Sequence, residues 1–420
     1  MLSPGDIQVL AIDKPAAGGR MIARVDGQVV LVSGTIPGER VTARIERVTK
    51  GVAYAQTIAV EDPSPDRRPT ASDPECGGGL YRHIAYARQL AVKRDVIVDA
   101  LARIGRLTLP SPPTVTPSPE DGYRMRARLH VRARRIGFFR EGTHDLCDAR
   151  QTGQLLPTSS DVVDRLTATL RSLGVDAVRE IELSENVDAS ERAIALDTDA
   201  PMDARVVERL AGTDGVTGLV WRGGVHGRPE VTDRLALDGS TIALQRHVLA
   251  FFQGNRYLLR DLVAHVVGRL KDEPVIDLYA GVGLFAIAAA ATRGVRVTAV
   301  EGDRQSAGDL DANAAGVRGV TAVHQSVEAF VRRVRLQADQ PNAPGTVIVD
   351  PPRTGLSREA LEGAIAIGAP RIVYVSCDVA TLARDARRIV DAGYGIDRAD
   401  AFDLFPNTPH VETVAVFDRS

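Results

Sequence analysis

The chain has 420 residues, a formal net charge of −2, and apolar and charged fractions of 44% and 25%. Two or three domains are expected, because this length exceeds what one typical hydrophobic core organises, and the near-neutral charge excludes a globally basic surface for a polyanion. No apolar run reaches the roughly 18–20 residues of a membrane span, and no basic segment followed by an apolar one opens the chain, so we expect a cytoplasmic protein with no membrane partner.

The three cysteines of the chain, Cys76, Cys147 and Cys377, lie far apart in the sequence. This spacing argues against a disulfide framework and against a metal cage built from cysteines alone. A lone cysteine is more often a small buried residue than a catalyst, so its position must decide its role.

The first 60 residues predict a small β-barrel. Glycine-containing turn signals at 18–19, 26–27 and 37–38 separate short apolar alternations. Val41, Ala43 and Ile45 alternate with polar residues, as on a half-buried strand. Five short strands in about 60 residues fit a barrel of the OB type, and we assign 1–60 to this domain.

A second, α+β domain is expected over 61–246. Residues 61–74 are rich in Pro, Asp and Arg and predict a linker, whereas the pattern from 86 to 104 is helical. Residues 109–121 are rich in Pro and Ser and predict a loop. The stretch 122–245 then mixes strand and helix signals.

Beyond residue 247 the chain predicts an open α/β sheet, because apolar strand-like runs alternate with helical ones. The expected strands are VIDLYA (275–280), RVTAV (296–300), VTAVHQ (320–325), GTVIVD (345–350) and RIVYVS (371–376), with helices at 284–292, 304–315, 357–366 and 380–392. The runs at 395–405 and 411–419 follow with no helix between them. We therefore expect these two runs to form an antiparallel pair that closes the sheet.

The run DLYAGVGLFA (277–286) predicts a strand, a glycine-rich turn and the start of a helix. Gly281 and Gly283 let the backbone turn tightly and approach a ligand closely, and Glu301 ends the next strand, where it can accept bonds from ribose hydroxyls. The spacing also satisfies the dinucleotide fingerprint. The loop alone therefore leaves open a nicotinamide cofactor, S-adenosylmethionine or no ligand, and the paired terminal strands with the motif at 347–355 favour S-adenosylmethionine.

The motif VIVDPPRTG (347–355) places Asp350 at the carboxyl end of a buried strand, where open α/β sheets bind ligands. Pro351 and Pro352 fix the turn that follows. This turn can present Asp350 beside the cofactor and Arg353 toward a phosphate or base, although a purely structural double proline is the alternative.

The run VSCDVATLARD (375–385) places Cys377 where the next strand gives way to a helix, whose N-terminus favours thiolate over thiol. A thiolate that adds to C6 of uracil makes C5 nucleophilic toward a methyl sulfonium, and a base must then remove the C5 proton so that the cysteine can leave. Glu412, in PHVETVAVF (409–417), enters the last strand and is the candidate base. A solvated edge residue is the alternative for Glu412.

Together, DLYAGVGLF, VDPPRTG, VSCDVATLARD and FPNTPHVETVAVF resemble the RNA (uracil-5-)-methyltransferases that carry an N-terminal TRAM domain. IPGERV in the barrel is similar to the TRAM domain, CGGGLYRHIAYARQLAVKRD (76–95) to the segment after it, and FFQGN (251–255) to the opening of the catalytic domain. The resemblance implies a Rossmann-like class I methyltransferase sheet over 247–420, the cofactor S-adenosylmethionine, and an RNA substrate, with ribosomal RNA favoured over transfer RNA.

The resemblance also assigns roles to single residues. The positions that match the family's cofactor-binding residues are Gln253, Tyr279, Glu301 and Asp350, beside Gly281 and Gly283. Cys377 matches the nucleophile, and Glu412 matches the base that removes the C5 proton.

Many members of this family carry four cysteines for a [4Fe–4S] cluster, and such a cluster needs four thiolates. Here Gly79 stands in place of a cysteine after Cys76, and Thr152 stands at the position of the fourth ligand, a few residues after Cys147. Only two cysteines remain outside the active site, so we predict no iron–sulfur cluster and expect Cys76 to be a packed thiol or a relic.

Residues 123–135 (YRMRARLHVRARR) predict a strand with one basic face, and no acid interrupts it. The basic positions on this face are Arg124, Arg126, Arg128, His130, Arg132 and Arg134. RNA phosphates can neutralise such a face, so the first three arginines, with Arg353, are candidate substrate-binding residues. Cross-strand carboxylates of Glu180 and Glu182 are the alternative. Phe138 and Phe139 are candidates for stacking on a base, although two adjacent phenylalanines more often place one ring in the core.

Three other functions fit parts of the sequence. A catalytically silent RNA-binding protein would keep the barrel and the sheet but would not need Cys377 and Glu412. A nicotinamide-dependent oxidoreductase leaves DPPR, SCD and HVE unexplained, and a methyltransferase of exocyclic amines would want an NPPY-like loop at 350–353. The target uridine stays open, and a monomer is expected.

Overall fold

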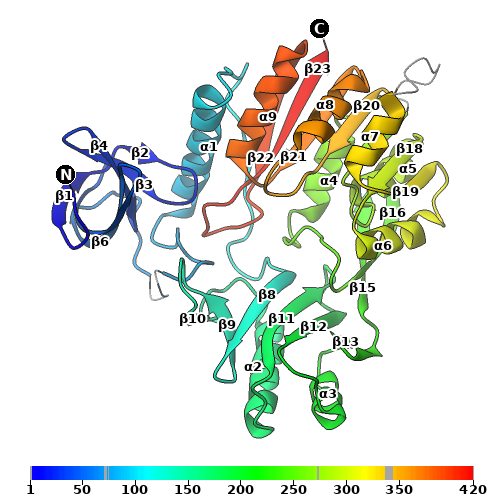
Figure 1. Cartoon of the computed structure of the whole chain (residues 1–420), viewed down its shortest axis with the longest axis horizontal. Helices are drawn as coiled ribbons and strands as arrows, with labels where there is room; N and C mark the ends of the chain where they lie inside the picture. Colours follow the sequence, from blue (N-terminus) through cyan, green and yellow to red (C-terminus); the bar gives the residue numbers. More distant parts are fainter. Residues whose placement is uncertain (1, 71–72, 74, 272–273, 336–343, 420) are drawn as a thin grey trace.

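Three sheets and a hairpin follow one another in the computed structural model, which describes residues 2–70, 73, 75–271, 274–335 and 344–419. The N-terminal sheet stands to one side, and the central sheet lies below the C-terminal one (Figure 1). Helix α1 (Tyr86–Arg103) stands between the N-terminal and C-terminal sheets. None of the described helices is long and apolar enough to cross a membrane.

The N-terminal sheet has, among the described residues, six strands in the order β1-β5-β6-β4-β3-β2. They are β1 (Ile7–Ala11), β2 (Lys14–Pro15), β3 (Met21–Val25), β4 (Gln28–Ser33), β5 (Arg40–Thr49) and β6 (Val52–Asp62). Val41, Ala43 and Ile45 are buried, as their alternation predicts, and register shifts between β5 and β6 bend the sheet. The prediction of five strands is corrected, because β2 is too short to show a periodicity and is a strand only through its pairing with β3.

The central sheet has the order β10-β9-β8-β11-β12-β13-β14, with two helices packed on it. Its elements are β8 (Arg126–Arg132), β9 (Arg135–Phe139), β10 (Leu146–Asp148), α2 (Pro157–Ser172), β11 (Val178–Glu185), β12 (Arg192–Thr198), α3 (Ala204–Ala211), β13 (Gly218–Trp221) and β14 (Gly224–Gly227). The basic strand predicted over 123–135 is too long at both ends. Ala133 and Arg134 have positive φ angles of 48° and 59° at the hairpin turn into β9, and neither residue is the Asn-Gly type that signals such a turn.

The C-terminal sheet has the order β19-β18-β17-β20-β21-β23-β22-β7. Its strands after residue 247 are β17 (Val275–Leu278), β18 (Val297–Glu301), β19 (Val320–His324), β20 (Thr346–Val349), β21 (Arg371–Ser376), β22 (Tyr394–Phe402) and β23 (Glu412–Arg419). Its helices are α4 (Leu259–Val267), α5 (Leu284–Arg293), α6 (Arg304–Ala314), α7 (Val327–Arg335), α8 (Arg358–Ala366) and α9 (Val379–Asp391). The first five strands are parallel, and β23 runs antiparallel between β21 and β22, which confirms the predicted terminal pair.

Three segments that come before α4 in the chain pair with the C-terminal sheet or share its hydrophobic cores. Strand β7 (Val115–Thr116) pairs with β22, so the prediction of an unbroken loop over 109–121 is wrong, because this pairing partner lies nearly 300 residues further along the chain. Helix α1 shares a core with α9 through Ile97 and Leu101. The hairpin of β15 (Glu230–Leu237) and β16 (Ser240–His247) buries Leu235 and Leu244 in the core of α4 and α5.

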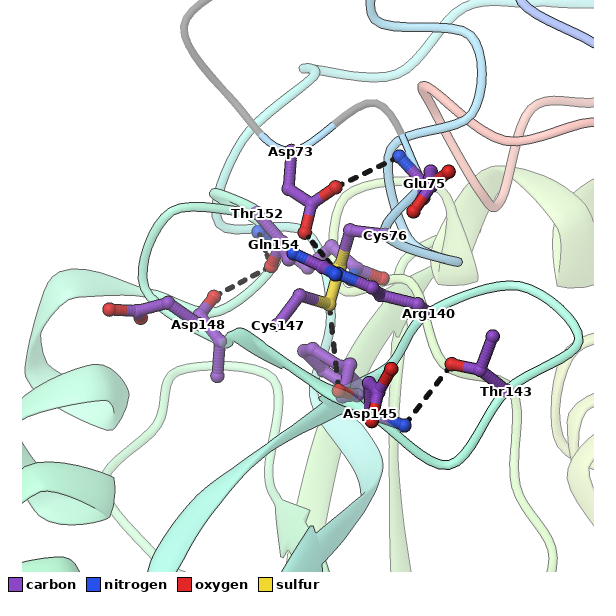
Figure 2. Close-up of a disulfide and its surroundings, with 12 residues drawn as sticks. Asp73, Glu75, Cys76, Arg140, Thr143, Asp145, Cys147, Asp148, Thr152 and Gln154 are labelled. Atoms are coloured by element: carbon purple, nitrogen blue, oxygen red, sulfur yellow. Dashed lines mark hydrogen bonds and ion pairs between the residues drawn. A yellow bond between two sulfur atoms is a disulfide. The ribbon is translucent and has the colours of Figure 1, made fainter. Parts of the chain in front are cut away.

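A disulfide joins Cys76 to Cys147, whose Cα atoms lie 5.8 Å apart (Figure 2). Cys147 lies in β10, and Cys76 forms an isolated bridge with Arg140, which follows β9. The Arg140 Nε also lies 2.7 Å from Asp73 Oδ2. The expectations of a packed thiol and of no disulfide are therefore wrong, because a sequence separation of 71 residues conceals that the segment around Cys76 runs alongside β9 and β10.

Candidate active site

The strand ends of the C-terminal sheet bring three predicted residues to one edge. Strands β17, β20 and β21 are parallel neighbours, so the residues that follow them meet at the same edge. Asp350 follows β20, and Cys377 follows β21. Strand β23 runs the other way, with Thr413 opposite Ser376, so Glu412 begins β23 where β21 ends.

The glycine-rich turn after β17 has an unusual backbone at three positions. Tyr279, Gly281 and Gly283 have φ angles of 63°, 56° and 96°, and a left-handed conformation at a residue with a side chain is sparsely populated and typical of functional turns. A Cβ atom at Gly281 would meet nothing within 4 Å, whereas one at Gly283 would lie 2.8 Å from Leu310 Cδ1. Gly283 therefore allows close packing on α6, and the backbone at Gly281 is open to a ligand.

Glu301 fixes this turn. Its Oε2 accepts a hydrogen bond from the Gly281 N–H (2.8 Å), and its Oε1 accepts one from the Asp303 N–H (2.6 Å). A carboxylate has about four acceptor positions, so Glu301 keeps capacity for the ribose hydroxyls that the sequence leads us to expect.

Three carboxyl groups lie close enough to influence one another: those of Asp277 and Glu412, which are buried, and that of Asp350, which is partly buried. Burial raises the pKa of Asp350 to about 7, and a hydrogen bond from Gln253 Nε2 to its Oδ2 (3.4 Å) opposes the rise. Burial, and then the charge of Asp350, raise the pKa of Asp277 and that of Glu412 well above their usual ranges. A nearby cation would lower all three pKa values, so this acidic cluster favours a positively charged ligand.

The Cys377 thiol differs from the thiolate that the sequence predicts. Burial, followed by the charge of Glu412, raises the pKa of Cys377 to about 12, and the Arg353 guanidinium opposes the rise. At the N-terminus of α9, the Asp378 side chain accepts from the N–H groups of Ala380 and Thr381 (3.0 and 2.8 Å). In the unliganded protein, burial and the neighbouring carboxyl groups therefore oppose the thiolate that the helix N-terminus favours.

The basic face of β8 meets acids on the neighbouring strand. Arg128 Nε lies 2.6 Å from Glu182, and His130 Nδ1 lies 3.1 Å from Glu180. Arg126 lies 3.8 Å from the same Glu182. The alternative of cross-strand carboxylates is thus what the structure shows for these three residues.

Of the two phenylalanines that follow this strand, Phe138 is not free to stack on a base. Phe138 is buried in the core of the central sheet. Phe139 stacks face to face on His130, with ring centroids 3.5 Å apart. The first of these residues is core, and the second has one face already covered.

Sequence reasoning missed Asp277 as a member of the site. It lies inside β17, whose other residues are apolar, and its side chain is fully buried. A carboxyl group inside an apolar strand is costly, and this cost was the available signal.

The residues present fit S-adenosylmethionine, which carries a sulfonium and an ammonium group. The acidic cluster suits those charges, and the backbone at Gly281 is open. Glu301 accepts a hydrogen bond from the Gly281 N–H. Gln253 donates one to Asp350. Tyr279 belongs to the same turn.

Two family models match the sequence. Residues 225–420 match tRNA (Uracil-5-)-methyltransferase, and residues 3–58 match the TRAM domain. An uncharacterized RNA methyltransferase of Lactobacillus johnsonii is 31% identical, with 99% of this chain and 98% of that protein covered. The 23S rRNA (uracil(1939)-C(5))-methyltransferase RlmD of Pseudomonas putida is 33% identical, with 99% and 94% covered.

A solved structure extends the similarity to three dimensions. It is the tRNA (uracil-54, C5)-methyltransferase of Pyrococcus abyssi in complex with S-adenosyl-L-homocysteine, with a TM-score of 0.76 and 25% identity. The match covers 97% of this chain and 99% of that one, so the similarity includes all three sheets.

Proposed function

This chain belongs to the RNA (uracil-5-)-methyltransferase family, and from that membership we propose that Cys377 is the nucleophile with which it methylates C5 of a uridine in RNA. The observation that carries the proposal is that Cys377 and Glu412 lie at adjoining strand ends, near the carboxyl group of Asp350. S-adenosylmethionine supplies the methyl group as a substituent of a sulfonium. We assign its binding to Gln253, Tyr279, Gly281, Gly283, Glu301 and Asp350.

The thiol must lose its proton before it can add to C6 of the uracil ring. In the unliganded protein the neighbouring carboxylates oppose this loss. A cationic cofactor offsets their charge, so we propose that cofactor binding precedes nucleophilic attack. Arg353 acts in the same direction, because its guanidinium lowers the pKa of Cys377.

Addition of the Cys377 sulfur to C6 places electron density on C5, so that C5 would take the methyl group while the methyl–sulfonium bond breaks and S-adenosylhomocysteine leaves. The proton that remains on C5 must pass to a base before the C6–sulfur bond can break. Glu412 is suited to this task, because burial raises its pKa and makes its ionised form a stronger base than an exposed carboxylate. The protein's contribution is therefore a nucleophile and a base held at neighbouring positions.

We propose ribosomal RNA as the substrate rather than transfer RNA. Support comes from the Pseudomonas putida relative, which is named for 23S rRNA and is more similar to this chain than the Pyrococcus abyssi tRNA enzyme. We further propose that the enzyme is cytoplasmic and monomeric. Nucleoside mass spectrometry on separated ribosomal and transfer RNA from a deletion strain tests the substrate: loss of 5-methyluridine from transfer RNA alone would overturn this choice.

The nucleophile is tested with RNA that contains 5-fluorouridine, because fluorine cannot leave C5 as a proton does and the adduct accumulates. Wild-type protein with S-adenosylmethionine should give a protein–RNA adduct that survives denaturation, and Cys377→Ala should give none. An adduct that persists in Cys377→Ala would exclude this residue as the nucleophile.

The base is tested with ordinary RNA and Glu412→Gln. This variant keeps the shape of the side chain but cannot take the C5 proton, so a covalent intermediate should accumulate and turnover should be slow. Normal turnover would remove Glu412 from the mechanism. If the variant is folded but forms no adduct, Glu412 would act before the bond between the Cys377 sulfur and C6 forms.

A further inference from the structure

Arg124 differs from the other basic residues of its segment. Arg126, Arg128 and His130 face the carboxylates of β11. Arg124 lies before β8, in an isolated bridge with Asn255, and has no ion-pair partner within the part of the chain that the structure describes. Its Nε is also buried without a hydrogen-bond partner among those residues. This guanidinium is therefore a cation that the described residues do not neutralise.

Aromatic rings connect Arg124 to the loop that leads into Glu412. Its Cζ lies 5.7 Å from the Phe138 ring centroid and 5.8 Å from that of Phe405. Phe405 in turn packs edge to face against His410, with ring centroids 6.0 Å apart. Arg124 and His410 thus share Phe405 as an aromatic neighbour. His410 lies two residues before the proposed base, Glu412.

His410 lies in a positive field. Its residue is exposed at the surface. Its pKa is nevertheless lowered to about 4, first because the surrounding protein removes water from the ring and then because of the charges of Arg353, Lys93 and Arg124. The Lys93 ammonium is buried in an ion pair with Asp403, which leaves the two arginines as the cations that can reach a ligand.

Arg353 brings this positive region to the nucleophile. It is exposed, follows the Pro351-Pro352 turn, and has no ion-pair partner in the described ranges. Its charge lowers the pKa of both Cys377 and Glu412, so its guanidinium lies near both. Two guanidinium groups without an ion-pair partner among the described residues, together with the neutral imidazole of His410, which can donate an N–H, are suited to bind an anion.

The chemistry of attack at C6 indicates which anion this is. In a nucleotide with the usual anti orientation, C6 is the ring carbon that faces the sugar and its 5′-phosphate. A nucleophile that attacks C6 therefore lies near that phosphate. We propose that Arg124, His410 and Arg353 bind the 5′-phosphate of the target uridine and so hold C6 next to Cys377. This inference rests on the proposed function.

The test uses variants of the two residues that do not influence the nucleophile directly, Arg124→Gln and His410→Gln, in the full-length protein. The matched control is Arg179→Gln, which removes an exposed arginine of β11 that is paired with Asp199. The probe is an in-vitro transcript of 23S rRNA. Binding is measured over a series of salt concentrations, and methyl transfer is measured from labelled S-adenosylmethionine.

One lost phosphate contact should lower the slope of log K against log salt by about 0.7 for single-stranded RNA. Because His410 is neutral at the assay pH, the double variant should lose no more slope than Arg124→Gln alone. The KM for RNA should rise about tenfold in each single variant, as for a lost charged hydrogen bond, while kcat changes less than about threefold. Arg124→Lys should recover part of the slope, which separates lost charge from lost packing.

A KM no higher than that of Arg179→Gln, or a double variant whose slope losses add, would overturn the assignment to one phosphate. If wild-type protein methylates no RNA, the proposed function fails, and the salt slope still decides whether Arg124 binds a phosphate. Once the modified uridine is known, an oligonucleotide with an uncharged methylphosphonate on its 5′ side gives a direct check. Wild-type protein should lose about tenfold in KM on it, and Arg124→Gln should lose nothing further.

Discussion

The thiol of Cys377 should react slowly with iodoacetamide in the unliganded protein. Burial, and then the charges of Glu412 and Asp350, raise its pKa from 9.0 to about 12. These values differ by about three pH units, so at neutral pH the thiolate population should be about a thousandfold smaller than that of an exposed cysteine. Cys76 and Cys147 are joined to each other, so Cys377 is the one free thiol, and labelling reports on it alone.

S-adenosylmethionine should accelerate this labelling, and S-adenosylhomocysteine should not. The two ligands have nearly the same shape, but only the first carries a sulfonium charge. A unit charge at about 6 Å in an effective dielectric of about 20 contributes about 3 kcal/mol, which corresponds to roughly two pH units. At the same pH, we expect the S-adenosylmethionine complex to be labelled roughly a hundredfold faster than the S-adenosylhomocysteine complex.

The assay follows the mass of the intact protein during carboxamidomethylation between pH 6 and pH 10, without reductant, with Cys377→Ser as the blank. A thiol that titrates below pH 9 in the unliganded protein would refute the argument from burial. Equal labelling rates in the two complexes would refute the argument that the cofactor's charge prepares the nucleophile.

Three further predictions concern stability, each measured by urea denaturation. The pKa of Asp350 is raised from 3.8 to about 7 on folding. Its contribution to the free energy of unfolding is therefore fully present below pH 4 and is lost as the pH rises through 7. Asp350→Asn should remove this part of the pH dependence of stability. Gly283→Ala should cost about 1–2 kcal/mol, because φ is +96° and the new Cβ would lie 2.8 Å from Leu310 Cδ1, and an unchanged midpoint would contradict this. Cys147→Ser should cost about 2–4 kcal/mol in oxidised protein and nothing in the presence of dithiothreitol, where the wild type also lacks the bond to Cys76.

The sequence predicted the C-terminal sheet well, because its parallel strands are short apolar runs that alternate with helices. The same pattern located the site, since residues at the carboxyl ends of parallel strands meet at one edge. Asp350 and Cys377 could therefore be placed before any coordinates were known. Helix α7 was not predicted, because its pattern, VEAFVRRVR, is short and strongly charged.

What the sequence could not predict depends on contacts between distant segments. The pairing of β7 with β22 and the disulfide of Cys76 leave no local pattern, because each partner's position is set by the rest of the fold. The surroundings of Cys377 could not be predicted for a related reason. A helix N-terminus favours a thiolate, but the carboxyl groups that oppose it come from Glu412 and Asp350, which lie on other strands.

On the basic face of the segment that contains β8, two interpretations of one pattern each hold for different residues. Alternation alone could not separate RNA contact from pairing with acids on the next strand. The structure places Arg128 opposite Glu182 and Arg126 3.8 Å from the same carboxylate, whereas Arg124 has no ion-pair partner among the residues that the structure describes. Arg126 and Arg128 lie within β8, whereas Arg124 precedes it. Periodicity does not define where a strand begins, so it could not separate these residues.

The packing of α1 on α9 has a consequence for how this enzyme is made. Roughly 280 residues separate the end of α1 from the start of α9, so at about 5–20 residues per second a ribosome needs roughly 15–60 s to deliver the second helix after the first. During that interval Ile97 and Leu101 have no partner helix to cover them. The yield of native enzyme in the cell therefore depends on what shields this apolar surface while synthesis continues.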